Sequence, residues 1–242
     1  MNPSIQAIFL DVGNTLRVVI KDAEFMKQAQ KDLMELLGVE QPESVFFDEL
    51  ETRWKAYRKQ AKELLVEVSE KELWTKWLLP DYPAETIAPL SGKLTRLWRD
   101  HGGIRIPRPD VKTTIPELNR RGYILGIIAN TITEREIPDW IESDGLTECF
   151  QTVALSSQVG IRKPNPEIFL ETARRVGIEP AKCAYVGDNP ARDVVGARNA
   201  GYGLTILIVD SADTAEPLTE EHQPDYAIRE LNELLDIFPP LR

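Results

Sequence analysis

The sequence contains little cysteine and histidine, with two residues of each, and it has no long hydrophobic run. Cys149 and Cys183 lie far apart, which excludes a disulfide-rich scaffold and a zinc site built on closely spaced cysteines. A membrane-spanning helix needs about 20 apolar residues, and the apolar run Ala7–Leu10 is too short even for a signal peptide. We therefore expect a cytoplasmic protein that does not enter a membrane.

Positive charge is also scarce, because 29 lysines and arginines face 39 aspartates and glutamates, for a formal net charge of −10. An acidic surface repels nucleic acid and anionic membranes, so we expect neither as a partner. A small anion remains a suitable ligand wherever a pocket has a positive local field. The composition leaves the oligomeric state open.

Short apolar runs that are typical of buried strands recur along the 242 residues, and helical patterns separate most of them. This alternation predicts an α/β fold, a doubly wound, Rossmann-like parallel sheet with helices on both faces. The expected strands are Ala7–Leu10, Tyr123–Ile128, Thr152–Leu155, Cys183–Val186 and Leu204–Val209, with Tyr226–Ile228 as a sixth candidate.

The stretch from Val18 to Ile104 shows no strand alternation and is rich in Glu, Lys, Leu and Ala, with four tryptophans spread through it. It reads as several amphipathic helices. Turn-forming residues cluster from His101 to Pro109 and mark its end. We therefore predict a core made of residues 1–17 and 105–242, with residues 18–104 inserted as an all-helical domain after the first strand.

Polar residues follow the predicted strands at the edge where an open α/β sheet binds ligands. Asp11 follows the first strand, Asn130 and Thr131 follow the second, and Lys163 follows the third; Asp188 and Asp193 follow the fourth. A carboxylate can attack phosphorus, provided that a cation offsets the repulsion between the two anions. Asp11 and Asp188 can supply the carboxylates that hold Mg²⁺, and a lysine can offset the remaining charge. The mixture suits phosphate chemistry.

These segments resemble the motifs of the haloacid dehalogenase-like hydrolase superfamily. The first motif is an apolar strand followed by Asp11-Val12-Gly13-Asn14-Thr15. The second ends a strand, at Ala129 here, and the third is a lysine, matched by Lys163. The fourth is Gly187-Asp188, with Asp193 a few residues on. The resemblance covers about residues 4–17 and 105–240, and the helical insertion lies where the family's first type of cap domain is placed.

The resemblance implies a hydrolase, a phosphatase that acts on a small phosphorylated metabolite with Mg²⁺ as cofactor. Asp11 would be the nucleophile and would form an aspartyl-phosphate. The metal would be bound by Asp11, Asp188 and the backbone carbonyl of Gly13. Lys163 would stabilise the charge of Asp11 and of the intermediate, and Asp193 would hold Lys163 or a metal-bound water.

Two positions depart from the family pattern. Gly13 stands where the family has a second aspartate that protonates the leaving group, and such acid–base help is typically worth roughly 10²–10⁴-fold. Ala129 stands where the family has a hydroxyl that binds the transferred phosphoryl group, a role that Asn130 or Thr131 could take over. We therefore expect a slow or narrowly selective enzyme.

Two other functions are compatible with the same residues. A dehalogenase of this fold would use Asp11 to attack carbon without a metal, although Asp188 and Asp193 argue for a cation. A non-catalytic member would bind a phosphorylated ligand or another protein, as the replacements at Gly13 and Ala129 would allow.

Overall fold

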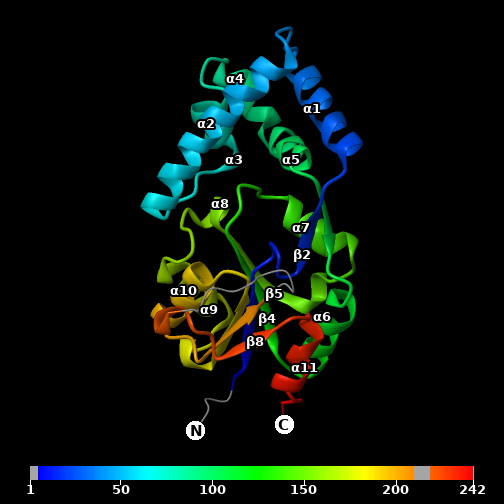
Figure 1. Ribbon diagram of the computed structural model, residues 1–242. Coiled ribbons are helices and arrows are strands. Elements are labelled where there is room, and N and C mark those ends of the chain that lie inside the picture. The colour runs from blue at the N-terminus through cyan, green and yellow to red at the C-terminus, as the bar shows by residue number, and fades with distance from the viewer. Residues whose placement is uncertain (1–4, 210–218, 242) are drawn as a thin grey trace.

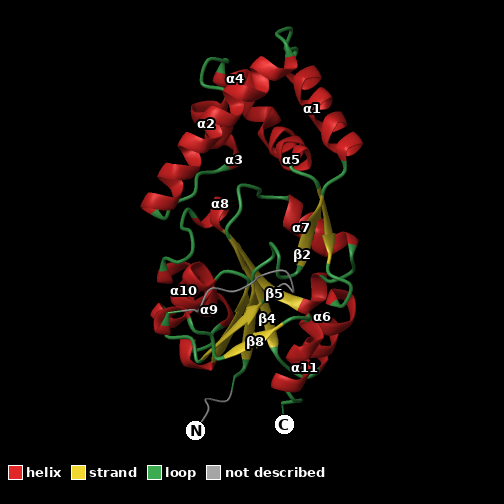
Figure 2. Cartoon of the chain, viewed as in Figure 1, coloured by secondary structure: helices red, strands yellow, loops and turns green. Residues whose placement is uncertain are grey.

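In the computed structural model, residues 5–209 and 219–241 are described, and the rest of the predicted core, residues 1–4, 210–218 and 242, lies outside the described residues. A six-stranded parallel sheet forms the lower half of the molecule in Figures 1 and 2. Its strands are β1 (Ala7–Leu10), β4 (Ile124–Ala129), β5 (Phe150–Leu155), β6 (Cys183–Gly187), β7 (Leu204–Ile208) and β8 (Tyr226–Ile228). They lie in the order β5-β4-β1-β6-β7-β8, and every neighbouring pair is parallel.

The predicted doubly wound fold is confirmed; two of the six expected strands, Ala7–Leu10 and Tyr226–Ile228, have the observed bounds, and the other four differ by one or two residues at an end. Helices cover both faces of the sheet (Figure 1). The helices and helical turns around it are α6 (Val111–Arg120), α7 (Glu136–Ser143), η3 (Thr147–Cys149), α8 (Ser156–Val159), α9 (Pro166–Val176), η4 (Pro180–Lys182), η5 (Pro190–Val194), α10 (Val195–Asn199), η6 (Glu220–His222), η7 (Leu231–Glu233) and α11 (Leu234–Ile237). No described helix is both long and apolar enough to cross a membrane.

Strand β1 shows why the sheet is central. Its four side chains have no exposed surface, and they alternate between the two faces, as the pleat requires. Ile8 and Leu10 belong to the apolar cluster that α6, α7 and α11 complete. Ala7 and Phe9 belong to the cluster that α9 and α10 complete. A strand buried on both faces reads as a continuous apolar run, which is why β1 was visible in the sequence.

The helices between residues 23 and 101 form a group of their own above the carboxyl edge of the sheet (Figure 1). They are α1 (Ala23–Leu37), α2 (Glu43–Leu64), α3 (Glu70–Glu72), η1 (Leu73–Leu78), α4 (Ala84–Ile87), η2 (Ala88–Leu90) and α5 (Ser91–His101). This group has a separate apolar core that includes Trp74 and Trp98. Ile132, from the loop after β4, also joins this core, so the two halves share a packed contact.

A two-stranded ribbon connects this helical group to the sheet. β2 (Arg17–Ile20) pairs antiparallel with β3 (Ile104–Pro107), the segment at which the chain returns to the sheet. The expectation that residues 18–104 are all helical is therefore wrong at both ends, for residues 18–20 and for Ile104. The run is only four residues long and two of its apolar side chains are nearly half exposed, so neither length nor burial marked it in the sequence.

A second connection lies on the opposite side of the helical group, after α2. Val66 forms an antiparallel bridge with Ile161, where Glu67 N donates to Gly160 O (3.1 Å) and Arg162 N donates to Leu65 O (3.0 Å). The buried Glu67 carboxylate accepts hydrogen bonds from Tyr57, Arg162 and Ser156 and thereby joins the helical group to the loops of the sheet. We call residues 65–67 and 160–162, with these partners, the clasp.

Candidate active site

The predicted site residues lie at the carboxyl edge of the sheet, because each of them follows a parallel strand. Asp11 comes directly after β1, and its backbone N–H continues the ladder by donating to Val186 O (2.9 Å). Asp188 follows β6, and Asp193 lies in η5 just beyond it. Lys163 lies in the loop that precedes α9. The structure brings Asp11, Lys163, Asp188 and Asp193 together.

Lys163 is fully buried between two carboxylates. Its Nζ lies 3.1 Å from Asp11 Oδ1 and 2.8 Å from Asp193 Oδ1, and it donates to the hydroxyl of Tyr185 at 2.5 Å. Burial, and then the negative charge of Asp193, raise the pKa of Tyr185, which keeps the phenol protonated and able to donate to Ile128 O (3.0 Å). A buried ammonium is tolerated only when it is paired. Lys163 therefore has one fixed position, beside Asp11.

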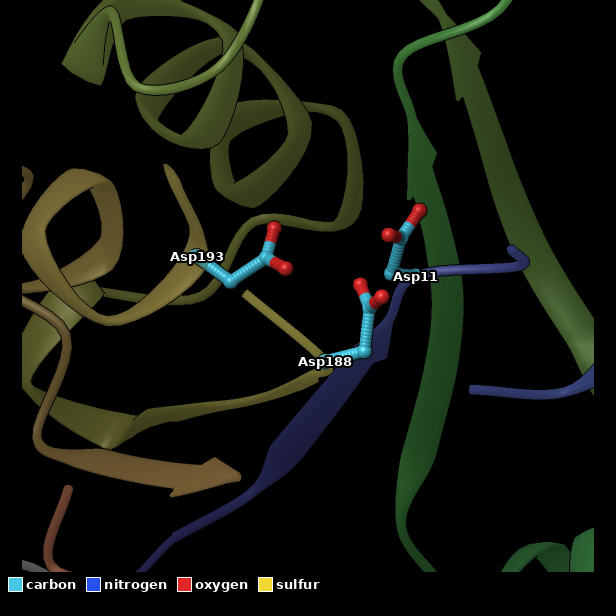
Figure 3. A group of neighbouring side chains, drawn as sticks. All are labelled: Asp11, Asp188 and Asp193. Atoms are coloured by element: carbon cyan, nitrogen blue, oxygen red, sulfur yellow. The ribbon is translucent and has the colours of Figure 1, made fainter. Parts of the chain in front are cut away.

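Three carboxylates converge at this edge, and Figure 3 shows Asp11 and Asp188 side by side with Asp193 facing them. Oxygen atoms of the three lie within 4.8 Å of one another. One nitrogen of the Arg192 guanidinium, Nη2, lies among them, 2.7 Å from Asp11 Oδ2, 2.6 Å from Asp188 Oδ1 and 3.0 Å from Asp193 Oδ2. Asn14 Nδ2 also donates to Asp188 Oδ2 (3.1 Å). The cluster is thus a place for positive charge.

The electrostatic environment separates the roles of these groups. Burial raises the pKa of Asp188, and the neighbouring Asp11 carboxylate raises it further. Burial acts on Asp193 too, but the Lys163 and Arg192 cations outweigh it and lower the pKa of Asp193. For Arg192, Asp11 and Asp193 outweigh burial and raise the pKa of the guanidinium. Asp193 is therefore a fixed anion that holds Lys163 and Arg192. Because its pKa is raised, Asp188 depends on a nearby cation to stay ionised.

The two glycines of the motifs differ in what they permit. A Cβ at Gly187 would lie 2.5 Å from Cγ of Asp193, so the close approach of Asp193 to the strand end requires glycine there. A Cβ at Gly13 would meet nothing within 4 Å, and the φ of Gly13 is not in the left-handed region. The absence of a side chain at position 13 is therefore not a steric requirement of the fold.

Asn130 and Thr131, the residues after β4, already form hydrogen bonds within the protein. Asn130 Oδ1 accepts from Lys163 N (2.8 Å), and Asn130 Nδ2 donates to Lys163 O (2.9 Å). Thr131 N donates to Ser156 Oγ (2.8 Å). Asn130 thus fixes the loop that carries Lys163, a positioning function that the sequence did not indicate.

A cavity of about 220 Å³ opens over Asp11. Ala129, Asn130 and Thr131 line one part of it, and Gly13 and Asp188 line another. Arginines from other elements complete the wall: Arg17, Arg99, Arg105 and Arg192. A chain with a net charge of −10 therefore presents a strongly basic pocket above its candidate nucleophile.

Sequence reasoning missed Arg192, Tyr185, Arg99 and Arg105. One signal for Arg192 was present, because it stands four residues after Asp188 at the start of a helix, where such pairs meet. Arg99 and Arg105 carried no local signal, since the long insertion separates them from Asp11 in sequence.

Comparisons with known proteins identify relatives of this architecture. A family model described as haloacid dehalogenase-like hydrolase matches residues 5–201. A glyceraldehyde 3-phosphate phosphatase from Methanopyrus kandleri is 34% identical over 131 residues, which are 54% of this chain and 56% of that protein. A phosphoserine phosphatase from Thermus thermophilus is 33% identical over 126 residues, 52% of this chain and 49% of that protein. The chain thus spans about half the length of the curated relatives that it matches.

Solved structures share the fold over nearly the whole chain. A 2-haloacid dehalogenase from Pseudomonas syringae has a TM-score of 0.72 at 21% identity and covers 96% of this chain and 97% of its own. A phosphatase of the same superfamily from Thermococcus onnurineus has a TM-score of 0.61 at 24% identity and covers 98% of this chain and 100% of its own. At such identities the likeness establishes the fold.

Proposed function

Because the chain belongs to the haloacid dehalogenase-like hydrolase family, we propose that it is a magnesium-dependent phosphomonoesterase that acts on a small phosphorylated metabolite. One observation carries this proposal: the buried Asp11 carboxylate, at the floor of a basic cavity, has Lys163 Nζ beside Oδ1 and Arg192 Nη2 beside Oδ2. A carboxylate held in this way beneath a cavity lined by arginines could attack a bound anion as a nucleophile. The phosphatase names of the relatives agree with it.

The residues at the cluster fit a divalent cation, because hard carboxylate oxygens converge there and Arg192 already places a positive charge among them. Asp11, Asp188 and the backbone carbonyl of Gly13 would hold Mg²⁺. When bound, the ion would screen the repulsion between Asp11 and the phosphoryl group and neutralise charge at the transition state. Arg192 would have to leave the cluster, and its side chain, 30% exposed, already reaches solvent on one side.

We propose the reaction that the family resemblance implies, which the positions of the side chains support. Asp11 attacks phosphorus, the bond to the ester oxygen breaks, and the phosphoryl group becomes an acyl phosphate on Asp11. Water then attacks that phosphorus, which releases phosphate and restores the carboxylate. Lys163 offsets the charge of Asp11 and of the intermediate, and Asp193 holds Lys163 in place. Lys163, Thr131 and the backbone at Asn130 would bind the phosphoryl oxygens.

Gly13 shapes the expected rate. With no carboxyl group at position 13, the departing alkoxide takes its proton from water, so esters with poor leaving groups should react slowly. We further propose that residues 18–104 act as a cap over the core of residues 1–17 and 105–242, with selectivity set by side chains that the cap contributes to the cavity.

The test is a panel of small phosphomonoesters assayed with Mg²⁺ and with chelator, for the wild type and for Asp11→Asn. We expect phosphate release that needs Mg²⁺ and that Asp11→Asn abolishes. Arg192→Ala should lower the Mg²⁺ concentration for half-maximal activity, because it removes the internal competitor, whereas Arg198→Ala, on the neighbouring α10, should not. No release from any ester with Mg²⁺ present would refute the proposal.

A second candidate is the metal-independent dehalogenase reaction. It is favoured by Arg192, whose guanidinium already places a positive charge among the carboxylates that would otherwise bind a metal. Asp11 would attack the carbon that carries the halogen and release halide. Halide release from a 2-haloacid in the presence of chelator would establish this reaction, and its absence would leave the phosphatase.

A further inference from the structure

Three arginines surround a single glutamate beside the cavity. Glu136, at the start of α7, is 5% exposed and pairs with Arg17 Nη1 (2.8 Å) and with Arg99. Arg17 Nη2 donates to Arg105 O (2.9 Å), which brings β2 and β3 to the same place. The other acid nearby, Asp100, pairs with Arg96 Nε at 3.4 Å. The cluster of Arg17, Arg99, Arg105 and Glu136 therefore keeps a surplus of positive charge.

Two of these arginines have donors left over. Arg105 Nη1 donates to the carbonyls of Arg99 (2.7 Å) and Gly103 (3.1 Å), while its Nε and Nη2 donate no hydrogen bond to the described residues. Arg99 donates through Nε to Glu136, and neither of its Nη groups donates to a described residue. Burial, and then the neighbouring Arg99 cation, lower the pKa of Arg105 to about 10, a sign of a partly desolvated charge without a paired acid. At this pKa the Arg105 guanidinium remains charged at neutral pH.

Arg99 and Arg105 also stand between two cavities. Both line the cavity over Asp11, and both line a second one of about 460 Å³ between the helical group and the sheet edge, where Trp54 and Trp98 add aromatic walls. A substrate whose phosphoryl group reaches Asp11 would thus place the rest of its structure past these two guanidinium groups.

We propose that Arg99 and Arg105 bind a second anionic group of the substrate, a carboxylate or a second phosphoryl group, a proposal that rests on the phosphatase function proposed above. Guanidinium groups bind such planar or tetrahedral oxyanions through paired, charge-assisted hydrogen bonds. Nε and Nη2 of Arg105, which donate to no described residue while Nη1 is fixed by two carbonyls, meet that requirement. Arg17 and Glu136 hold the two arginines in place and do not bind the anion, because both Nη groups of Arg17 are already used. Phosphomonoesters without a second anionic group are poor substrates, because they offer no acceptor for these charge-assisted hydrogen bonds.

Three probes of the same chain length separate the possible ligands: 2-phosphoglycolate, ethylene glycol bisphosphate and ethyl phosphate. Turnover is measured with Mg²⁺ for the wild type, and dissociation constants are measured by calorimetry in Asp11→Asn, which cannot form the covalent intermediate. We expect at least one of the two probes with an anionic tail, 2-phosphoglycolate or ethylene glycol bisphosphate, to bind about tenfold to hundredfold more tightly than ethyl phosphate. A preference for 2-phosphoglycolate identifies a carboxylate and a preference for the bisphosphate a second phosphoryl group. Equal affinity for all three overturns the proposal.

Variants locate the effect. Arg105→Gln should raise KM and the dissociation constant of the preferred probe about tenfold or more, with kcat and the binding of ethyl phosphate nearly unchanged, and Arg105→Lys should recover part of the loss. Lys93→Gln removes the same charge from an exposed position on α5 and should change neither. An unaltered preference in folded Arg105→Gln overturns the assignment; if that variant does not fold, the wild-type comparison decides. Selective binding without any turnover would refute the phosphatase and leave the anion site standing.

Discussion

At the scale of single residues, position 13 offers an open place for a carboxylate next to the candidate nucleophile. Nothing lies within 4 Å of a Cβ built on Gly13, and its φ is compatible with any residue. We therefore predict that Gly13→Asp folds normally and raises kcat for esters with poor leaving groups by about tenfold or more, because a positioned general acid typically contributes roughly 10²–10⁴-fold.

This prediction is checked by comparing kcat of the wild type and Gly13→Asp for phenyl and alkyl phosphates, with Gly13→Asn as the control that adds bulk without an acid. The gain should be largest for the alkyl ester, whose leaving oxygen needs the proton most. A folded Gly13→Asp protein with unchanged rates on both esters would show that proton transfer does not limit this reaction.

The residues predicted from the sequence share one property: each directly follows a strand, or lies in the loop or the helical turn beyond one. Parallel strands end at one edge, so the position of Asp11 in the sequence already predicted its proximity to Asp188. Arg192 was not predicted, because its contact with three carboxylates depends on the side-chain conformation that η5 gives it. Arg105 was not predicted either, since only the return of the chain through β3 brings it to the cavity.

At the scale of elements, α7 is fixed to the ribbon and to α5 through one buried carboxylate. Burial opposes ionisation of Glu136, but the Arg99, Arg17 and Arg105 cations outweigh it and lower the pKa of Glu136 below its ordinary value of 4.5. A carboxyl group whose pKa is lowered on folding stabilises the fold above its unfolded pKa, and this contribution is lost as the pH falls through the folded pKa.

We therefore predict that Glu136→Gln lowers the free energy of unfolding at pH 7 by about 1.5–3 kcal/mol, the range for a hydrogen bond to a charged group. The difference from the wild type should shrink as the pH drops below about 4.5, where the unfolded carboxyl group takes up its proton. Urea unfolding across this pH range measures it, and Glu142→Gln, an exposed position on the same helix, serves as the control. A difference that stays constant with pH would contradict this account.

The elements themselves were largely predictable, for a physical reason. Strands buried on both faces must be apolar throughout, so β1, β4, β6 and β7 stand out as runs between helical patterns. β2 did not, because it belongs to a two-stranded ribbon with exposed side chains such as Val19 and gains its stability from a partner far along the chain. Pairing over such a distance leaves no periodicity in the local sequence.

At the scale of the whole molecule, the clasp ties the helical group to the sheet through a buried ion pair. Glu67 is 4% exposed, and its carboxylate is the partner of Arg162 as well as an acceptor for Tyr57 and Ser156 (3.1 Å). Glu67→Gln leaves the largely buried guanidinium of Arg162 without its anion, so we predict a loss of about 3–5 kcal/mol in the free energy of unfolding.

Chemical denaturation of Glu67→Gln measures this loss. Glu63→Gln provides the matched control, because Glu63 lies on the same α2, is 62% exposed in its side chain and faces Lys59 at 4.0 Å. A midpoint for Glu67→Gln equal to that of the control would mean that the clasp contributes nothing to the folded state.

The clasp also affects how a ligand can enter the cavity over Asp11. On the sheet side, the clasp segment of residues 160–162 ends at Arg162. The next residue is Lys163, whose ammonium lies beside Asp11. An outward rotation of the helical group about the ribbon would either break the main-chain hydrogen bonds at residues 65–67 or shift the peptide bond between Arg162 and Lys163. If the helical group acts as a cap, opening it on this side would therefore also disturb the position of the Lys163 ammonium beside Asp11.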